Sequence, residues 1–255
     1  MSSPGATPGS TLARLATAWL ILIAVTAEAR SQTLVADLSS HLIAITAGFT
    51  GTEVLLFGAT EGEGEVIVVV RGPESEVTVR RKRRTLGIWV NRGSITFEGV
   101  PSFYAVASSR PLAEIVQPEV LSRQQIGVDN LQFQAPEGIR ESRLKKYHDA
   151  LIRNKQRAGL FSGEVGQVTF LGERLFRTEI YFPANVPTGS YLVEVLLVRD
   201  GEVVSAQTSP LIISKIGIGA EIFDFAHNRA ALYGVLAIIG ALMAGWSAHL
   251  VFRRV

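Results

Sequence analysis

A run of five consecutive basic residues stands inside a stretch that otherwise has the pattern of a β-strand. Its members, with the aromatic residue that follows closely, are Arg80, Arg81, Lys82, Arg83, Arg84 and Trp89. Such a run is typical of targeting signals, nucleic-acid surfaces and sites for anions or acidic partners. A regular strand alternates its side chains between two faces, so the run requires a turn, a bulge or a strand edge. We interpret it either as charge that protects a sheet edge or as an anion or partner surface.

A second concentration of positive charge lies further along the chain. Seven Lys or Arg residues occur between Arg140 and Arg157, together with only two acidic residues. Apolar residues recur there at helical spacing, and Gly159 follows as a C-terminal stop signal, which predicts an amphipathic helix. The residues of its apolar stripe are Leu144, Tyr147, Leu151 and Ala158. This basic helix would extend the anion surface if the fold brings it beside the run of five.

The chain carries no motif that is typical of catalysis or of cofactor binding. It has no nucleophile elbow, phosphate loop or dinucleotide fingerprint, and its lack of cysteine excludes thiolate catalysis and cysteine zinc sites. The four histidines have no short ligand spacing; they are His41, His148, His227 and His249. We therefore expect a protein that is not an enzyme and that holds no cofactor and no metal.

The two ends of the chain predict export and a membrane anchor. After Arg14, the apolar residues 15–25 lead to Ala27-Glu28-Ala29, the pattern of a signal peptide (residues 1–29) that is cleaved near Ala29. Residues 230–252 contain no formally charged residue and are long enough to cross the hydrocarbon core as a helix. The residues expected at the membrane interface are Tyr233, Trp246, Arg253 and Arg254.

These ends decide the compartment in which the basic run lies. We expect a single-pass protein of the bacterial inner membrane, with the N-terminal domain in the periplasm and residues 253–255 in the cytoplasm. An exported domain meets no nucleic acid, so a nucleic-acid partner is not expected. The net charge of +2, from 25 basic and 23 acidic residues, also gives no reason to expect a polyanion partner.

Between the ends, short β-branched and aromatic runs alternate with Gly and Pro turns. This pattern predicts a mainly β fold, an immunoglobulin-like antiparallel β-sandwich with a short helical insertion. The expected boundaries are a β-sandwich at 30–112, a helical connecting region at 113–164, a second β unit at 165–215 and a juxtamembrane segment at 216–229. The sequence leaves open whether the two β regions share a sheet or form separate units.

Three local patterns make this prediction more specific. Residues 66–70 are apolar on both faces, which indicates a central strand. Asp200-Gly201 between two alternating runs is a hairpin signal. Tyr191 follows the corner at Gly189, an arrangement that looks like the late strands of an immunoglobulin-like sandwich.

The stretch VTVRRKRRTLGIWVNRGSITFEGVPSFYAVASSRPL resembles a family of putative transmembrane proteins described from alphaproteobacteria. The resemblance covers nearly the whole chain, including LVADLSSHLIAITAGFTGTEVLLFGA, FPANVPTGSYLVEVLLVRDG and KIGIGAEIFDFAHNRAALYG. It implies no activity and no catalytic residues. It does imply a genomic context, because such proteins tend to be encoded beside a permease that resembles sulfite or organosulfonate exporters.

From these observations we expect a non-enzymatic, membrane-anchored periplasmic accessory protein that is the partner of an anion permease. The alternative is an envelope structural or assembly factor that binds other proteins through its β-sandwich.

Overall fold

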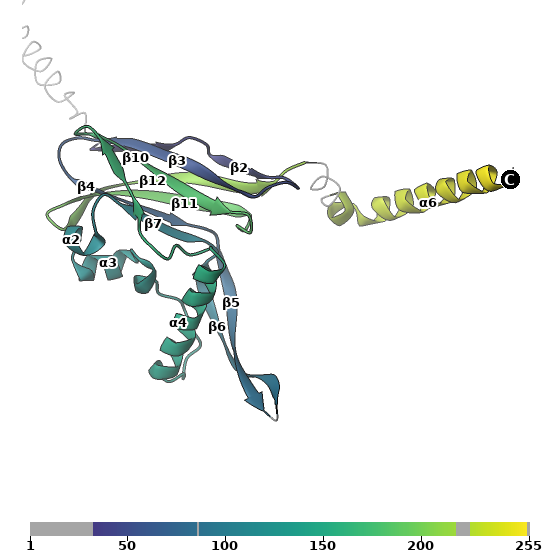
Figure 1. The fold of residues 1–255 in the computed structure, drawn as a ribbon, viewed down its shortest axis with the longest axis horizontal. Helices are drawn as coiled ribbons and strands as arrows, with labels where there is room; N and C mark the ends of the chain where they lie inside the picture. Colours follow the sequence, from purple (N-terminus) through teal and green to yellow (C-terminus); the bar gives the residue numbers. More distant parts are fainter. Residues whose placement is uncertain (1–32, 86, 218–224, 254–255) are drawn as a thin grey trace, which may run out of the picture. The chain divides into compact units, whose positions relative to one another are not determined.

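The computed structural model describes residues 33–85, 87–217 and 225–253. Within these residues, two β-sheets pack face to face (Figure 1). The first has the order β1 (Leu34–Leu38), β3 (Gly51–Thr60), β10 (Leu175–Pro183), β9 (Thr169–Leu171). The second has the order β2 (Leu42–Ile45), β12 (Glu202–Lys215), β11 (Gly189–Arg199), β4 (Glu65–Arg71), β7 (Tyr104–Ser108), β8 (Gly166–Gln167). The predicted signal peptide lies outside the described residues.

The strand order confirms the predicted immunoglobulin-like sandwich. The first sheet corresponds to strands A, B, E and D of that fold, and β4, β11 and β12 correspond to C, F and G. The Tyr191 hydroxyl donates a 2.6 Å hydrogen bond to the carbonyl oxygen of Pro187, which is the tyrosine corner of such domains. Asp200 and Gly201 both have positive φ and connect β11 to β12, as the hairpin signal predicted.

The two β regions of the sequence share both sheets. β3 pairs with β10 in the first sheet, where Leu56 lies opposite Thr178. β4 pairs with β11 in the second, where Val68 lies opposite Val195. Of the two arrangements that the sequence left open, the structure therefore has the shared one, with strands of both regions alternating across the sandwich.

β4 is a central strand that is buried on both faces, as predicted. Val66, Val68 and Val70 point into the core between the two sheets. Ile67 and Val69 point into a second core on the opposite face of the six-stranded sheet. The continuous apolar run is thus explained by two separate layers of packing.

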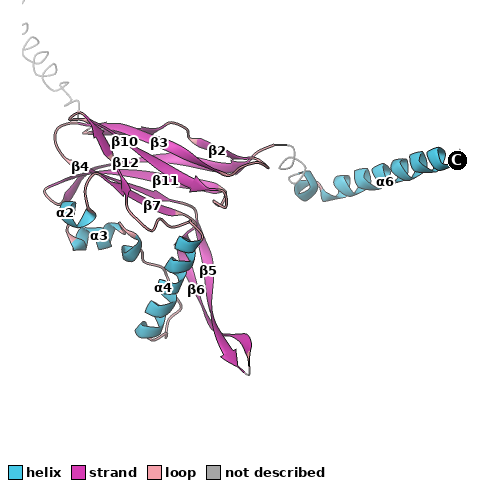
Figure 2. Cartoon of the chain, in the orientation of Figure 1, coloured by secondary structure: helices cyan, strands magenta, loops and turns pink. Residues whose placement is uncertain are grey.

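The second core is closed by the helical region and by a long hairpin. The helices are α2 (Leu112–Ile115), α3 (Pro118–Gln124), the 3-10 turn η1 (Val128–Asn130) and α4 (Glu141–Arg157). Figure 2 shows them together on one side of the six-stranded sheet. α4 confirms the predicted amphipathic helix: Tyr147 and Leu151 are buried and Gly159 follows in the left-handed region, although Ala158 is exposed beyond the helix end.

The hairpin consists of β5 (Glu74–Thr85) and β6 (Ile88–Pro101), inserted between β4 and β7. Its base joins the second core through buried residues of both strands: Val79, Ile95, Phe97 and Val100. β6 is one strand of 14 residues that runs through Gly93. Gly93 adopts a φ of 80° at a bulge, and the pairing of β6 with β5 continues on both sides of it.

α6 (Ala230–Phe252) confirms the predicted C-terminal helix. Residues Ala230–His249 have a mean hydropathy of 1.7 and are long and apolar enough to cross a membrane. Tyr233 and Trp246 are exposed on it, and Arg253 follows directly as its C-cap. Arg254 lies outside the described residues.

Candidate anion-binding cleft

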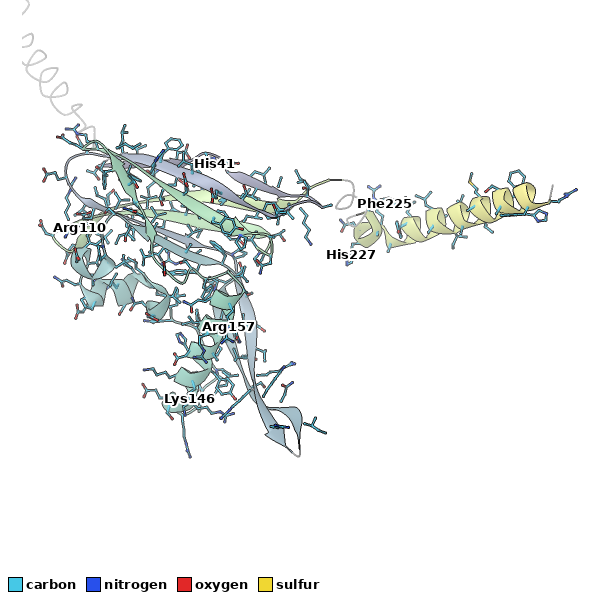
Figure 3. All side chains as sticks on the ribbon, viewed as in Figure 1. His41, Arg110, Lys146, Arg157, Phe225 and His227 are labelled. Atoms are coloured by element: carbon cyan, nitrogen blue, oxygen red, sulfur yellow. The ribbon has the colours of Figure 1, made fainter. Side chains whose placement is uncertain are left out.

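A cleft of about 950 Å³ lies between the hairpin strand β5 and the helix α4. Among the described residues, seven basic ones line it and no acidic one does. They are Arg80, Arg81 and Lys82 from β5 with Arg140, Arg143, Lys146 and Arg153 from α4 and its N-cap. Lys146 marks this helix in Figure 3. The basic run and the basic helix, which are far apart in sequence, therefore form one surface.

A β-bulge in β6 lies opposite the three consecutive basic residues of the cleft wall. Arg80 is the register partner of Ser94 and Lys82 is the partner of Asn91, so Arg81 faces two residues of β6 instead of one. The extra residue twists the hairpin locally. The bulge satisfies the requirement read from the sequence, that five basic residues in a row interrupt a regular strand.

α4 contributes one face at helical spacing. Arg143, Lys146, Ala150 and Arg153 recur at intervals of three and four residues. The N-terminus of the helix also lies at the cleft, and its N-cap, Arg140, makes no side-chain capping hydrogen bond. The partial positive charge of a helix N-terminus therefore adds to the positive charges of the side chains.

Aromatic packing holds α4 against the hairpin. The Phe97 ring of β6 contacts the rings of Phe133 and His148 at centroid distances of 6.2 and 6.4 Å. The Arg143 guanidinium lies 5.7 Å from the centre of the Tyr147 ring. A Cβ atom at Gly93 would lie 2.9 Å from Arg143 Nη2, so β6 passes directly against this side of the helix. Any substitution that loosens these contacts would open the cleft.

The charges of the cleft have no carboxylate partners. Within the described part of the chain, none of the seven basic side chains takes part in an ion pair. Two arginines outside the cleft do have such partners: Arg71 lies 2.6 Å from Glu194, and Arg110 contacts Glu65 and Glu114. The cleft therefore gathers seven basic side chains that have no ion-pair partner among the described residues.

The structure separates the residues of the predicted surface. Arg80, Arg81 and Lys82 line the cleft, whereas Arg84 lies beyond it and its Nε donates to the Gly87 carbonyl oxygen at 3.4 Å. The backbones of Arg83 and Trp89 lie in β5 and β6, and their side chains are outside the described parts of the structure. The α4 residues were predicted only as a basic helix, because sequence spacing cannot show which strand a helix packs against.

Perturbed ionisable groups lie outside the cleft. Burial raises the pKa of Tyr104 to about 12, and its hydroxyl donates to the Gln125 carbonyl oxygen while accepting from the Gly127 N–H. Burial lowers the pKa of Lys155, whose ammonium group lies over the Phe161 ring. Both groups pack the second core, and neither is paired with a nucleophile. Across the described residues, no group of three His, Asp or Glu side chains could hold a metal ion.

Comparison with known protein families places the chain. The family described as "Putative transmembrane protein (Alph_Pro_TM)" matches residues 33–254, almost the whole chain. No curated protein matches the chain.

Proposed function

The chain belongs to this family of transmembrane proteins, and from that premise we propose that it is a non-catalytic accessory protein that binds an organic oxyanion for a partner permease. In this proposal α6 anchors it in the bacterial inner membrane and the β-domain lies in the periplasm. The observation that carries the proposal is the convergence of seven unpaired basic residues on one cleft.

The cleft suits an anion that has an apolar part. Its charged groups surround apolar lining residues, namely Val79, Ile139, Tyr147 and Ala150. A volume of about 950 Å³ is at the upper end of the range for small-molecule sites, so a small inorganic oxyanion alone would leave most of it to water. An alkanesulfonate fills it better, because guanidinium groups can hydrogen-bond the sulfonate while the alkyl chain contacts Tyr147.

The exposure of the charges makes the binding weak and reversible. Exposed ionic contacts contribute little each and are screened by salt. Such an anion would dissociate quickly, as an accessory protein that delivers solute to a permease requires.

Calorimetry on the full-length protein in nanodiscs tests the anion site. We expect affinity to rise from sulfate to ethanesulfonate to hexanesulfonate and to fall with added salt. Equal affinity for all three anions would contradict a site with an apolar lining. Purification of the tagged protein at native expression after mild solubilisation tests the partner, and the absence of any enriched permease would refute that part of the proposal.

A second candidate function, an envelope assembly factor, is favoured by an apolar row across the outer face of the four-stranded sheet. Val35, Ala59, Leu175 and Leu171 are successive register partners on β1, β3, β10 and β9, and three of them are about half exposed. Such a row is a contact surface for another protein. Deletion of the gene discriminates the two functions: a defect confined to sulfur oxyanions supports transport, and general envelope sensitivity supports assembly.

A further inference from the structure

The β5–β6 hairpin continues beyond the last residues that it contributes to a core. Val79 and Ile95 are register partners and are the most distal buried residues of the two strands. All side chains described between Arg80 and Ser94 are exposed. From Arg80 to Thr85 the strand extends by about 17 Å. This segment, residues 80–94, is called the distal arm; its described residues belong to β5 and β6 except Gly87, and none of its described side chains is buried.

The tip of the distal arm presents apolar side chains to solvent. Ile88 is 68% exposed, more than any other large apolar side chain described outside α6, and Val90 is 44% exposed. Positions 88 and 90 lie on the same face of β6, because strand side chains alternate with a period of two. No core requires apolar residues at these positions, so they indicate a contact with something outside the domain.

Basic residues stand directly behind the apolar tip. Arg84 is one residue from the end of β5, and Lys82, Arg81 and Arg80 follow toward the domain. An apolar end backed by positive charge matches the order of layers at a bilayer with anionic lipids, where phosphates lie outside the hydrocarbon. The charge also disfavours a second copy of the same arm as the occupant, because two such arms would repel each other.

The membrane anchor keeps the arm close to such a surface. Residues 216–229, which connect β12 to α6, can span at most about 50 Å. A tethered domain meets the bilayer at a high effective concentration, so a weak contact is sufficient. The arm is also long enough, because one interfacial layer of a bilayer is only about 5–8 Å thick.

We propose that the tip of the distal arm, Arg84 with Ile88 and Val90, inserts into the headgroup region of a bilayer that contains anionic lipid. Arg84 then contacts lipid phosphates, while the cleft at the base of the arm stays in water. This contact gives the domain a second attachment to the membrane besides α6 and fixes the direction in which the cleft opens. It does not depend on which anion the cleft binds.

Tryptophan fluorescence of the full chain in nanodiscs tests this contact. The sequence has three tryptophans, so a Trp19→Phe/Trp246→Phe variant leaves Trp89, next to Ile88, as the only reporter. With phosphatidylglycerol discs, we expect spin labels at the headgroup level to quench Trp89 at least twofold more than with phosphatidylcholine discs. Arg84→Gln should reduce the docked-to-undocked ratio about fivefold, the effect of one basic residue near an anionic surface.

A matched pair of double variants controls for general effects. Ile88→Ser/Val90→Ser should reduce the quenching to that of a water-exposed tryptophan. Val204→Ser/Ile212→Ser, at positions of β12 that are 49% and 50% exposed, should leave it unchanged. The proposal is overturned if Trp89 is not quenched in either disc, or if both double variants behave alike. It is also overturned if Trp89 becomes protected only as protein concentration rises, which would identify a second copy as the occupant. If the protein does not bind alkanesulfonates but Trp89 is still quenched, the anion site in the cleft is refuted and the membrane contact of the distal arm is not.

Discussion

Replacing Arg143 by Gln separates a binding role of the cleft from a structural one. Arg143 lines the cleft, stacks over Tyr147 and has like-charged neighbours three residues away on both sides, Arg140 and Lys146. Removing the two repulsive pairs stabilises the helix by about 0.4–1 kcal/mol in total. Losing the cation–π contact costs about 0.5–1 kcal/mol. Because these effects offset each other, we expect the free energy of unfolding to change by less than about 0.5 kcal/mol.

The effect of the same change on anion binding is larger. A sulfonate about 4 Å from a guanidinium gains about 1 kcal/mol in water and about 4 kcal/mol at the effective dielectric constant of a protein surface. The cleft is open to water, so the lower part of this range applies. A loss of about 1–2 kcal/mol corresponds to an affinity about 5–30 times weaker. Titration calorimetry with hexanesulfonate and urea unfolding of the same samples measure the two quantities.

Lys145 provides the matched control. It is the second residue after Arg143 on α4, it is exposed, and it lies outside the cleft. Lys145→Gln removes the same unit of charge from the same helix, so the two variants have equal net charge. We expect hexanesulfonate affinity to change less than twofold in this control. If both variants weaken binding equally, the anion responds to net charge alone and the reasoning about the cleft is refuted.

Three further predictions concern the parts that support the cleft and the anchor. Phe97→Ala should destabilise the domain by about 3–5 kcal/mol in urea unfolding, because a ring that is 1% exposed leaves a cavity, and anion binding should weaken as α4 loosens. Burial raises the pKa of Tyr104 to about 12, so the contribution of its neutral phenol to the free energy of unfolding is fully present below pH 10 and falls by up to about 2.7 kcal/mol as the pH rises toward 12. Tyr104→Phe should remove this contribution to the pH dependence from unfolding curves measured across that pH range. Leu242→Arg should make the free energy of membrane insertion less favourable by about 2.5–3.5 kcal/mol, because it places a charge near the middle of α6. Release of the variant from membranes by alkaline carbonate would confirm this, and unchanged membrane retention would argue against a spanning helix.

Local patterns in the sequence were sufficient for the strands and for the sandwich class. The uninterrupted apolar run at residues 66–70 predicts a strand that is buried on both faces, and the Tyr191 corner indicates the immunoglobulin-like topology. The pairing of distant strands was left open, because register partners such as Val68 and Val195 are joined by no local signal.

The candidate site shows the same division between local and distant information. Five basic residues in a row require a turn, a bulge or a strand edge, and the structure has a bulge opposite Arg81, between Arg80 and Lys82. That α4 packs beside this bulge depends on the contact of Phe97 with Phe133 and His148, which comes from three separate segments. Helical periodicity identifies the face of α4 that is buried, but the partner of that face is a property of the whole fold.

The unpaired charge of the cleft remains the strongest argument for a binding role. Arg71 and Arg110 lie beside carboxylates in this fold, whereas the seven basic residues of the cleft have no such partner among the described residues. Clustering seven basic residues around one cleft costs stability through mutual repulsion. An anion that neutralises part of this charge would recover that free energy on binding, so it would stabilise the native state by an amount that grows with the logarithm of its concentration above Kd. The same repulsion that destabilises the free protein therefore becomes part of the driving force for binding.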